Sequence, residues 1–199
     1  MAQFALEGSR VAGVELDGGE RLVADHVVLA AGAQSALLAR AAGVPLPVRP
    51  AKGYSLTLQR VATVPTPLLP VVDTSLHMAV VPVGADRLRV AGTAEFTGHD
   101  TTINPARTAN LLRLLRQFYP DLARALDGVD PSPWTGLRAM CPDGVPLIGP
   151  SGLDRLWINT GHGHVGWTLA AGSGQLAAEL ILGATPAVPS QNYDPRRFG

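Results

Sequence analysis

The alternation of apolar and polar residues predicts that the chain begins with strands. We expect three extended segments within residues 3–31, of which RVAGVEL at 10–16 alternates most clearly. The third ends in HVVLAA at 26–31, a continuous apolar run that is typical of a strand buried on both faces. This strand leads through Gly32 into a short helix predicted over residues 34–43, which ends at a glycine.

A different pattern begins at Val44, where several prolines mark a crossing segment. The pattern then predicts three strands, at 54–61, 77–84 and 86–96, and the last two form a hairpin. Asn104 followed by Pro105 is a typical helix start, and apolar residues at helical spacing predict a helix that stops before Pro120. We therefore expect an antiparallel sheet with a helix on it.

The last part of the chain alternates between strands and loops before a final helix. The pattern predicts strands at 133–140 and 155–159, a turn-rich loop at 141–150, a helix over 168–183 and an irregular tail. The whole chain is predicted to have an α/β (α+β) fold in two parts. Residues 1–44 and 136–199 form one α/β domain, and residues 45–135 form an antiparallel-sheet domain inserted into it.

Composition and charge exclude several classes of protein. Of the 199 residues, 46% are hydrophobic and 16% are charged, which indicates a globular chain with a sizeable core. Sixteen basic residues balance sixteen acidic ones, so we expect no nucleic-acid partner. A single cysteine, Cys141, excludes an internal disulfide and fits a reducing compartment. The first ten residues lack the features of a secretory signal, so we predict a cytoplasmic protein.

The segment NTGHGHVGW at 159–167 places Gly161, Gly163 and Gly166 in the spacing G-x-G-x-x-G. A pyrophosphate-binding fingerprint also needs a second strand after the helix and an acidic residue at its end. Here the helix is followed by a proline-rich tail, and Asp194 in that tail has no predicted strand to hold it. We therefore reject the pyrophosphate interpretation of this motif.

Two interpretations of the glycine segment remain. The glycines can form a tight turn between a strand and a helix, with no ligand. Alternatively, the helix N-terminus presents free N–H groups and about half a positive charge to a group that is or becomes anionic. A flavin fits the second interpretation, because negative charge develops at the N1–C2=O edge of its ring on reduction. His162 and His164, with His99 and Cys141, form only a weak metal-binding pattern, so we expect no metal site.

Two stretches of the chain carry a family resemblance. They are ADHVVLAAGAQSALLARAAGVPLPVRPAKGYSLTL, and GLRAMCPDGVPLIGP followed by LWINTGHGHVGWTLAAGSGQLAAELILG. Together they resemble the FAD-dependent D-amino-acid dehydrogenases, which belong to the wider D-amino-acid oxidase, glycine oxidase and sarcosine oxidase group. The match runs from about Ala24 to Gly183 and is loose between 62 and 130. The resemblance implies a FAD-binding α/β domain that is interrupted by an antiparallel-sheet substrate domain.

The resemblance also implies that this chain is the C-terminal portion of such an enzyme. The family binds the FAD pyrophosphate through an N-terminal βαβ unit with its own glycine fingerprint, which is not found before Ala24. We therefore expect the N-terminal FAD-binding half to be a partner for cofactor binding.

Individual site residues follow from the same resemblance. Arg138 matches the arginine that binds the substrate carboxylate, and its alternative interpretation is a surface arginine at a strand end. Tyr54 and His164 are candidate substrate-binding residues, although Tyr54 is equally well interpreted as a half-buried strand residue. Ala31 and Gly32 match a turn near the adenosine end of FAD. The residues that match the loop under the flavin ring are Gly161, His162, Gly163, Val165, Gly166, Trp167 and Thr168.

The function implied by the resemblance is the oxidative deamination of D-amino acids to 2-oxo acids and ammonia. Hydride would pass from the substrate Cα to flavin N5, and electrons would leave to a membrane quinone, with the protein peripheral on the inner face of the cytoplasmic membrane. One alternative is a glycine- or sarcosine-type amine oxidase of the same family. Another is a non-catalytic fragment or a subunit that needs another chain.

Overall fold

The computed structural model describes residues 3–60 and 65–198. The chain divides into two compact units, and each is described by itself. Unit 1 comprises the residues up to Pro50 together with those from Arg138 onward, and unit 2 comprises Ala51–Leu137. The mixed α/β fold class is confirmed. The assignment of residues 1–44 with 136–199 to cofactor binding, and of 45–135 to substrate binding, stays a prediction.

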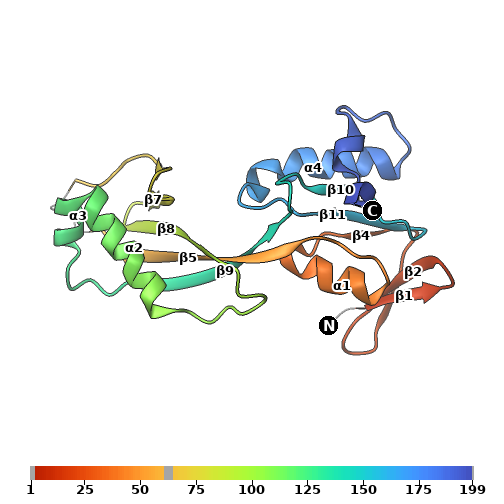
Figure 1. The fold of residues 1–199 in the computed structure, drawn as a ribbon, viewed down its shortest axis with the longest axis horizontal. Helices are drawn as coiled ribbons and strands as arrows, with labels where there is room; N and C mark the ends of the chain where they lie inside the picture. Colours follow the sequence, from red (N-terminus) through yellow and green to blue (C-terminus); the bar gives the residue numbers. More distant parts are fainter. Residues whose placement is uncertain (1–2, 61–64, 199) are drawn as a thin grey trace. The chain divides into compact units, whose positions relative to one another are not determined.

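Unit 1 contains two three-stranded sheets with helices between and after their strands (Figure 1). Its first half comprises β1 (Gln3–Glu7), β2 (Arg10–Glu15), β3 (Arg21–Val23), β4 (Val27–Leu29), the 3-10 helix η1 (Gly32–Gln34) and α1 (Ser35–Ala41). Its second half comprises β10 (Leu147–Pro150), β11 (Leu156–Thr160), α4 (Gly166–Ile181), and the 3-10 helices η2 (Ser190–Tyr193) and η3 (Pro195–Phe198). One sheet has the order β1-β2-β3, and the other has the order β10-β11-β4 with β11 parallel to β4.

Three predictions for unit 1 were wrong in detail. The predicted three strands of residues 3–31 are four, because the third breaks between β3 and β4. The run at 26–31 is not buried on both faces, since the side chain of Val28 is 42% exposed within the described residues. The second half of the predicted loop at 141–150 is strand β10, whose residues pair antiparallel with β11. Proline and glycine on both sides of Leu147 and Ile148 hid this strand in the sequence.

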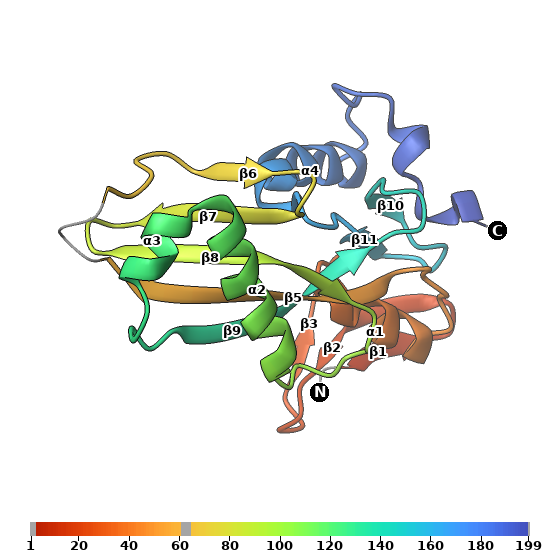
Figure 2. The same ribbon diagram turned by 60° about the vertical axis from the view of Figure 1, so that its left-hand side comes forward.

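Unit 2 is built around a five-stranded sheet in the order β6-β7-β8-β5-β9, with two helices packed on it (Figure 2). Its strands are β5 (Arg49–Gln59), β6 (Val71–Asp73), β7 (Met78–Val83), β8 (Arg87–Glu95) and β9 (Ser132–Met140), and its helices are α2 (Pro105–Phe118) and α3 (Pro120–Ala125). Strands β5 and β9 also extend into unit 1. The hairpin predicted from 77–84 and 86–96 is confirmed as the pair of β7 and β8. The predicted strand 54–61 begins five residues earlier, and its residue 61 lies outside the described residues.

Helix α2 confirms the strongest local prediction. The side-chain oxygen of Asn104 accepts a hydrogen bond of 3.0 Å from the backbone N–H of Ala106, which caps the helix. Leu111 and Leu115 are buried on one face against the sheet. The helix ends before Pro120 as predicted, but this proline also begins α3, which the sequence analysis did not predict.

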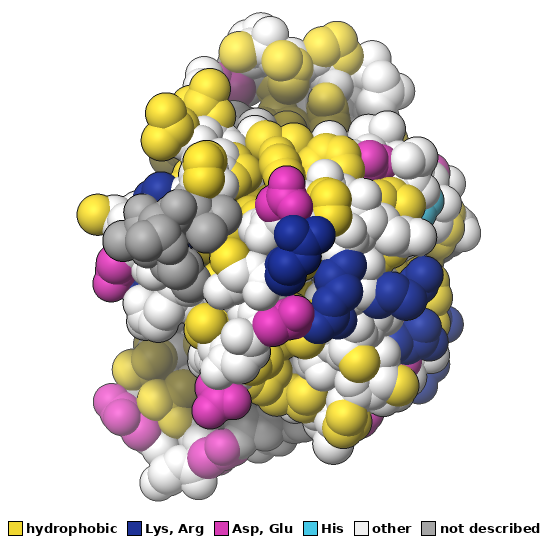
Figure 3. Space-filling view, turned by 90° about the vertical axis from the view of Figure 1, so that its left-hand side faces the viewer, with side chains coloured by type: hydrophobic (Ala, Val, Ile, Leu, Met, Phe, Trp, Pro, Cys, Tyr) yellow, Lys and Arg dark blue, Asp and Glu magenta, His cyan; other side chains and the backbone are white. Residues whose placement is uncertain are grey.

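The solvent side of α2 carries arginines that have polar partners. Arg107 contacts Glu95 at 2.7 Å, and Arg116 contacts Asp127 at 2.8 Å. Figure 3 shows basic side chains gathered on this face of unit 2, with acidic side chains beside them. Both of these arginines therefore have an acidic partner.

Candidate functional site

The glycine segment turns the chain from β11 into α4. Gly161 and Gly163 have φ angles of +83° and +59°, a region that residues with a side chain rarely adopt. Gly166 has a different role, because a Cβ there would lie only 3.3 Å from the Cβ of His162. The first two glycines are therefore required by backbone conformation and the third by close packing.

The glycine segment lies against the end of β9. The backbone N–H of Gly163 donates a hydrogen bond of 2.8 Å to the carbonyl oxygen of Ala139, and Met140 forms an isolated β-bridge with His162. Arg138 directly precedes Ala139 in the same strand. Two predicted parts of the site that are distant in sequence, Arg138 and the glycine segment, are thus brought together within unit 1.

Thr160 connects the two segments that are predicted to bind the cofactor, the glycine segment and the turn of Ala31 and Gly32. Its hydroxyl donates a hydrogen bond of 3.0 Å to the carbonyl oxygen of Gly32, and its side chain is 1% exposed. Gly32, with a φ of +54°, follows Ala31 and begins η1, just after β4. Thr160 was not predicted as a site residue, because its signal in the sequence is only a polar residue at the end of an apolar strand.

The N-terminus of α4 is not capped by a side chain. Its N-cap residue is Val165, no side-chain oxygen accepts from the first turn, and no acidic residue lies in that turn. The indole of Trp167 in the first turn is 96% exposed. The N–H groups and the positive end of the helix dipole are therefore directed toward an open surface, which suits an electron-rich ligand.

The two histidines of the segment differ in their surroundings. His162 Nε2 lies 2.9 Å from the hydroxyl oxygen of Ser173 in α4, and burial lowers the pKa of His162. Its imidazole is therefore neutral near pH 7, and its hydrogen bond with Ser173 connects the glycine turn to α4. His164 is exposed. Ser173 was not predicted as a site residue.

Arg138 is half-buried near the end of β9, and burial lowers the pKa of its guanidinium. An arginine keeps its charge under such a shift, because the guanidinium is far more basic than the other side-chain groups. A charged, half-buried guanidinium is chemically suited to bind a carboxylate through two parallel hydrogen bonds. Its role as the substrate-binding residue stays a prediction.

Tyr54 lies in the core of unit 2. Its side chain is 1% exposed, and its hydroxyl donates to the carboxylate of Glu95. Lys52 is also buried and contacts Glu95 at 3.6 Å and Asp100 at 2.9 Å. The Tyr54 hydrogen bond, followed by that of Arg107, holds the pKa of Glu95 below its usual value. The substrate-binding role of Tyr54 stays a prediction, and the proton of its hydroxyl is already donated to Glu95.

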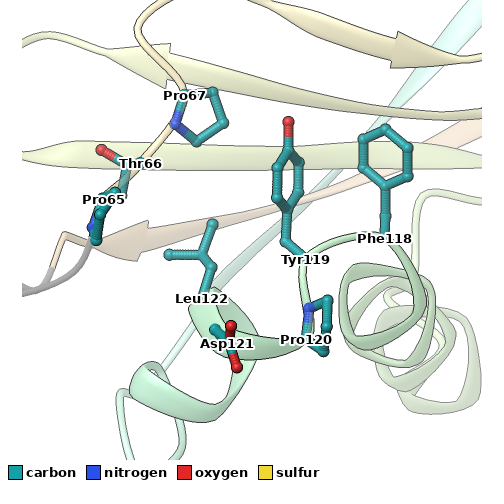
Figure 4. Close-up of a pocket in the computed structure, with 8 residues that line it drawn as sticks. All are labelled: Pro65, Thr66, Pro67, Phe118, Tyr119, Pro120, Asp121 and Leu122. Carbon is teal, nitrogen blue, oxygen red and sulfur yellow. The ribbon is translucent and has the colours of Figure 1, made fainter.

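Each unit also contains a cavity. The cavity in unit 1 has a volume of about 380 Å³ and is lined by the first turns of α4, including Thr168 and Ser173, and by Val145 and Tyr193. The cavity in unit 2 has a volume of about 420 Å³. In Figure 4 the rings of Phe118 and Tyr119 stand side by side at its α2–α3 border, opposite the segment of Pro65 to Pro67. Only the unit 1 cavity includes a predicted site residue.

The described residues show neither a metal-binding cluster nor a membrane-spanning helix. Residues 3–60 and 65–198 contain no group of three or more His, Cys, Asp or Glu side chains placed to hold a metal ion. Within the same ranges, none of the helices combines the length and the apolar character needed to span a bilayer.

Comparisons with known proteins agree on one family. Residues 2–180 match the family model described as FAD dependent oxidoreductase. The chain is 42% identical over 198 residues to a D-amino acid dehydrogenase of Methylobacterium nodulans, covering 100% of this chain and 46% of that protein. Among solved structures, glycine oxidase from Geobacillus kaustophilus has a TM-score of 0.81 at 26% identity, covering 98% of this chain and 52% of that one. Iminodiacetate oxidase from Chelativorans sp. BNC1 shares the fold, with a TM-score of 0.84 at 23% identity and coverages of 98% and 52%.

These coverages limit what the matches assign. The chain spans about half the length of the curated relatives it matches. The matches therefore account for nearly all of this chain, but for only part of each relative.

Proposed function

On the premise that this chain belongs to the FAD dependent oxidoreductase family, we propose that it forms the substrate-facing part of a flavin-dependent enzyme that oxidatively deaminates D-amino acids. The products would be a 2-oxo acid and ammonia. The observation that carries the proposal is the uncapped N-terminus of α4, held beside the strand of Arg138 by the bond between Gly163 and Ala139.

The residues present fit the cofactor that the family implies. The glycine turn lets a flat ligand approach the backbone closely, and the uncapped N–H groups of α4 suit the N1–C2=O edge of a flavin. The predicted contacts are Gly161, His162, Gly163, Val165, Gly166, Trp167 and Thr168, with Ala31 and Gly32 toward the adenosine end. The hydrogen bond from Thr160 to Gly32 supports these predicted contacts, because it connects the segment before α4 with the turn after β4.

The chemistry divides between cofactor and protein. FAD, when bound, would supply the two-electron oxidant for the substrate Cα–H bond, as a hydride acceptor. The guanidinium of Arg138 binds the substrate carboxylate through two parallel hydrogen bonds and so orients the Cα–H bond. A substrate amine that binds in its neutral form needs no protein base. The resulting imino acid takes up water and releases ammonia, which balances the reaction.

Further partners are part of the same proposal. Because the chain spans about half the length of its relatives, we propose that FAD binding needs additional polypeptide, corresponding to the N-terminal half of those proteins. We also propose a cytoplasmic location, peripheral on the inner face of the membrane, with a membrane quinone as the electron acceptor.

The first experiment asks whether flavin binds. The purified chain is mixed with FAD, alone and together with the additional polypeptide, and the visible flavin absorbance that stays with the protein is measured. We expect coloured protein in at least the second mixture. If both mixtures stay colourless after unbound FAD is removed, the chain is a non-catalytic fragment and the proposed function is wrong.

The second experiment tests Arg138 in the mixture that binds flavin. Replacing Arg138→Ala should raise KM for D-alanine at least about tenfold, the factor expected from a lost charged hydrogen bond. Arg138→Lys should recover part of the loss. The control is Arg40→Ala, which removes an exposed arginine from α1. An unchanged KM in Arg138→Ala would contradict the carboxylate-binding role.

A second candidate function is the oxidation of glycine or a secondary amine such as sarcosine. The likeness to glycine oxidase, at 26% identity over 98% of this chain, favours it. Substrate profiling separates the two candidates. A preference for D-alanine over glycine and sarcosine supports the first, and the reverse preference supports the second.

A further inference from the structure

The guanidinium of Arg197, in the C-terminal 3-10 helix η3, is held in the loop between β9 and β10. Its Nε and Nη2 atoms donate parallel hydrogen bonds of 2.9 and 3.1 Å to the two carboxylate oxygens of Asp143. Nη2 also donates to the carbonyl oxygen of Val145 at 2.8 Å, and Nη1 donates to that of Pro146 at 3.4 Å. The side chain is only 16% exposed. This is a specific bidentate contact between a largely buried guanidinium and a partly exposed carboxylate, unlike the single-atom contacts of most surface arginines.

The tail around Arg197 also packs on strand β10. Pro195 is buried, and a Cβ placed on Gly149 would lie 3.2 Å from its Cδ atom. Asp194 accepts three hydrogen bonds from Arg196, and the one from the backbone N–H, at 2.8 Å, fixes the turn that leads into η3 without the Arg196 side chain. We call residues 194–197 the C-terminal latch; it lies beside β10 in Figure 1.

The loop that the latch holds touches the glycine turn. Cys141 begins this loop, is 5% exposed, and its Sγ atom lies 3.6 Å from Nη2 of Arg197. On its other side, the Cβ of Cys141 lies 3.5 Å from the position that a Cβ of Gly161 would take. A continuous series of contacts therefore runs from Arg197 through the loop to Gly161.

We infer that Arg197 is a positioning residue, which holds the Cys141–Pro146 loop against Gly161 and thereby sets the position of the glycine turn. The inference rests on the proposed function only for its consequence, which is the fit of the turn to a flavin. The contacts themselves need no cofactor and can be tested without one.

Cys141 provides a direct readout of the latch, because it is the one cysteine of the chain and it is covered by the loop. Burial, reinforced by the Asp143 carboxylate, raises the pKa of its thiol to about 11, and the Arg197 charge opposes this increase. Loss of the Arg197 charge alone would therefore make the thiol less reactive, since the thiolate is the reacting form. A faster reaction after removal of Arg197 therefore reflects greater access of the reagent to the thiol, because the change in acidity acts in the opposite direction.

The test measures the rate at which a thiol reagent modifies Cys141 in the folded chain under native conditions. Arg197→Met should increase this rate about tenfold to a hundredfold, which corresponds to the loss of a charged hydrogen-bond pair. Arg197→Lys keeps the charge without the parallel bonds and should give an intermediate rate. The matched control is Arg196→Met, which removes the neighbouring arginine, 59% exposed and paired with Asp194 in the same turn; its rate should equal that of the parent.

The inference is overturned if a folded Arg197→Met or Arg197→Lys chain reacts at the parental rate, or if Arg196→Met reacts as fast as Arg197→Met. The Lys variant decides the question if the Met variant does not fold. In the flavin-binding mixture, Arg197→Met should also weaken FAD binding about tenfold and shift the visible flavin spectrum, and Arg196→Met should change neither. Absence of FAD binding by the parent would overturn the proposed function, whereas the thiol rates alone decide the latch.

Discussion

The hydroxyl of Thr160 donates a hydrogen bond of 3.0 Å to the carbonyl oxygen of Gly32. The two residues are 128 positions apart in the chain, yet Thr160 ends strand β11 and Gly32 begins η1, which follows β4, the parallel partner of β11. In a parallel pair both carboxyl ends meet at one edge of the sheet, which is where ligands bind in open α/β folds. Both predicted cofactor segments begin at this edge.

Thr160→Val removes the donor and keeps the shape of the side chain. Because the Gly32 carbonyl would lose its partner next to a fully buried residue, we expect the free energy of unfolding to fall by about 1 kcal/mol. Urea denaturation measures the change. Thr160→Ser retains a hydroxyl and should recover part of the loss, and a Val variant as stable as the parent would show that the bond contributes nothing.

Two glycine substitutions should have opposite effects on the stability of the folded chain. Gly163→Ala forces a side chain into a φ of +59° and should destabilise the chain by about 1 kcal/mol or more. Gly174→Ala lies inside α4, where an added methyl group meets no atom within 4 Å, and should stabilise the chain by up to about 1 kcal/mol. Thermal unfolding of both variants checks the pair. Equal effects of the two substitutions would mean that the turn is not conformationally constrained.

The elements that could be predicted from sequence are those with local signals. Asn104 and Pro105 define the start of α2 by themselves, and the spacing of Gly161 and Gly163 defines the turn before α4. Strand β10 was missed because it is identified by its pairing with β11 and not by its own residues. Helix α3 was missed because Pro120 can either end a helix or begin one.

The site could be predicted only in part, because many of its contacts join residues that are distant in sequence. The resemblance supplied Arg138 and the glycine segment, but the partners that hold them are distant in sequence. Thr160 acts on Gly32, and Arg197 acts on Asp143, through contacts that no local pattern reveals. Tyr54 could not be distinguished from a pocket residue, since its partner Glu95 lies on the neighbouring strand β8.

The buried cluster of Glu95, Tyr54 and Lys52 should make stability depend on pH. The pKa of Glu95 is lowered in the folded chain from its ordinary value of 4.5, chiefly by the Tyr54 hydrogen bond and then by Arg107. The folded state therefore binds fewer protons than the unfolded state as Glu95 titrates. The stabilisation is complete above pH 4.5 and is lost as the pH falls through the folded pKa.

The corresponding measurement is the thermal midpoint of unfolding as a function of decreasing pH. Glu95→Gln cannot titrate, so its midpoint should fall less steeply below pH 4.5 than that of the parent. The control Glu20→Gln removes an exposed carboxylate and should leave the slope as it is in the parent. Identical slopes for the parent and Glu95→Gln would contradict the role of the cluster.

Trp167 offers an optical test of where the flavin binds. Its indole is 96% exposed in the first turn of α4, where the proposed site places the flavin edge, so FAD binding should quench its fluorescence. In the flavin-binding mixture, Trp167→Phe should lose most of the quenching that the parent shows on FAD addition. Trp134→Phe removes another exposed tryptophan, 61% exposed in β9, and should retain the parental change. Equal quenching in the parent and Trp167→Phe would place the flavin away from the N-terminus of α4.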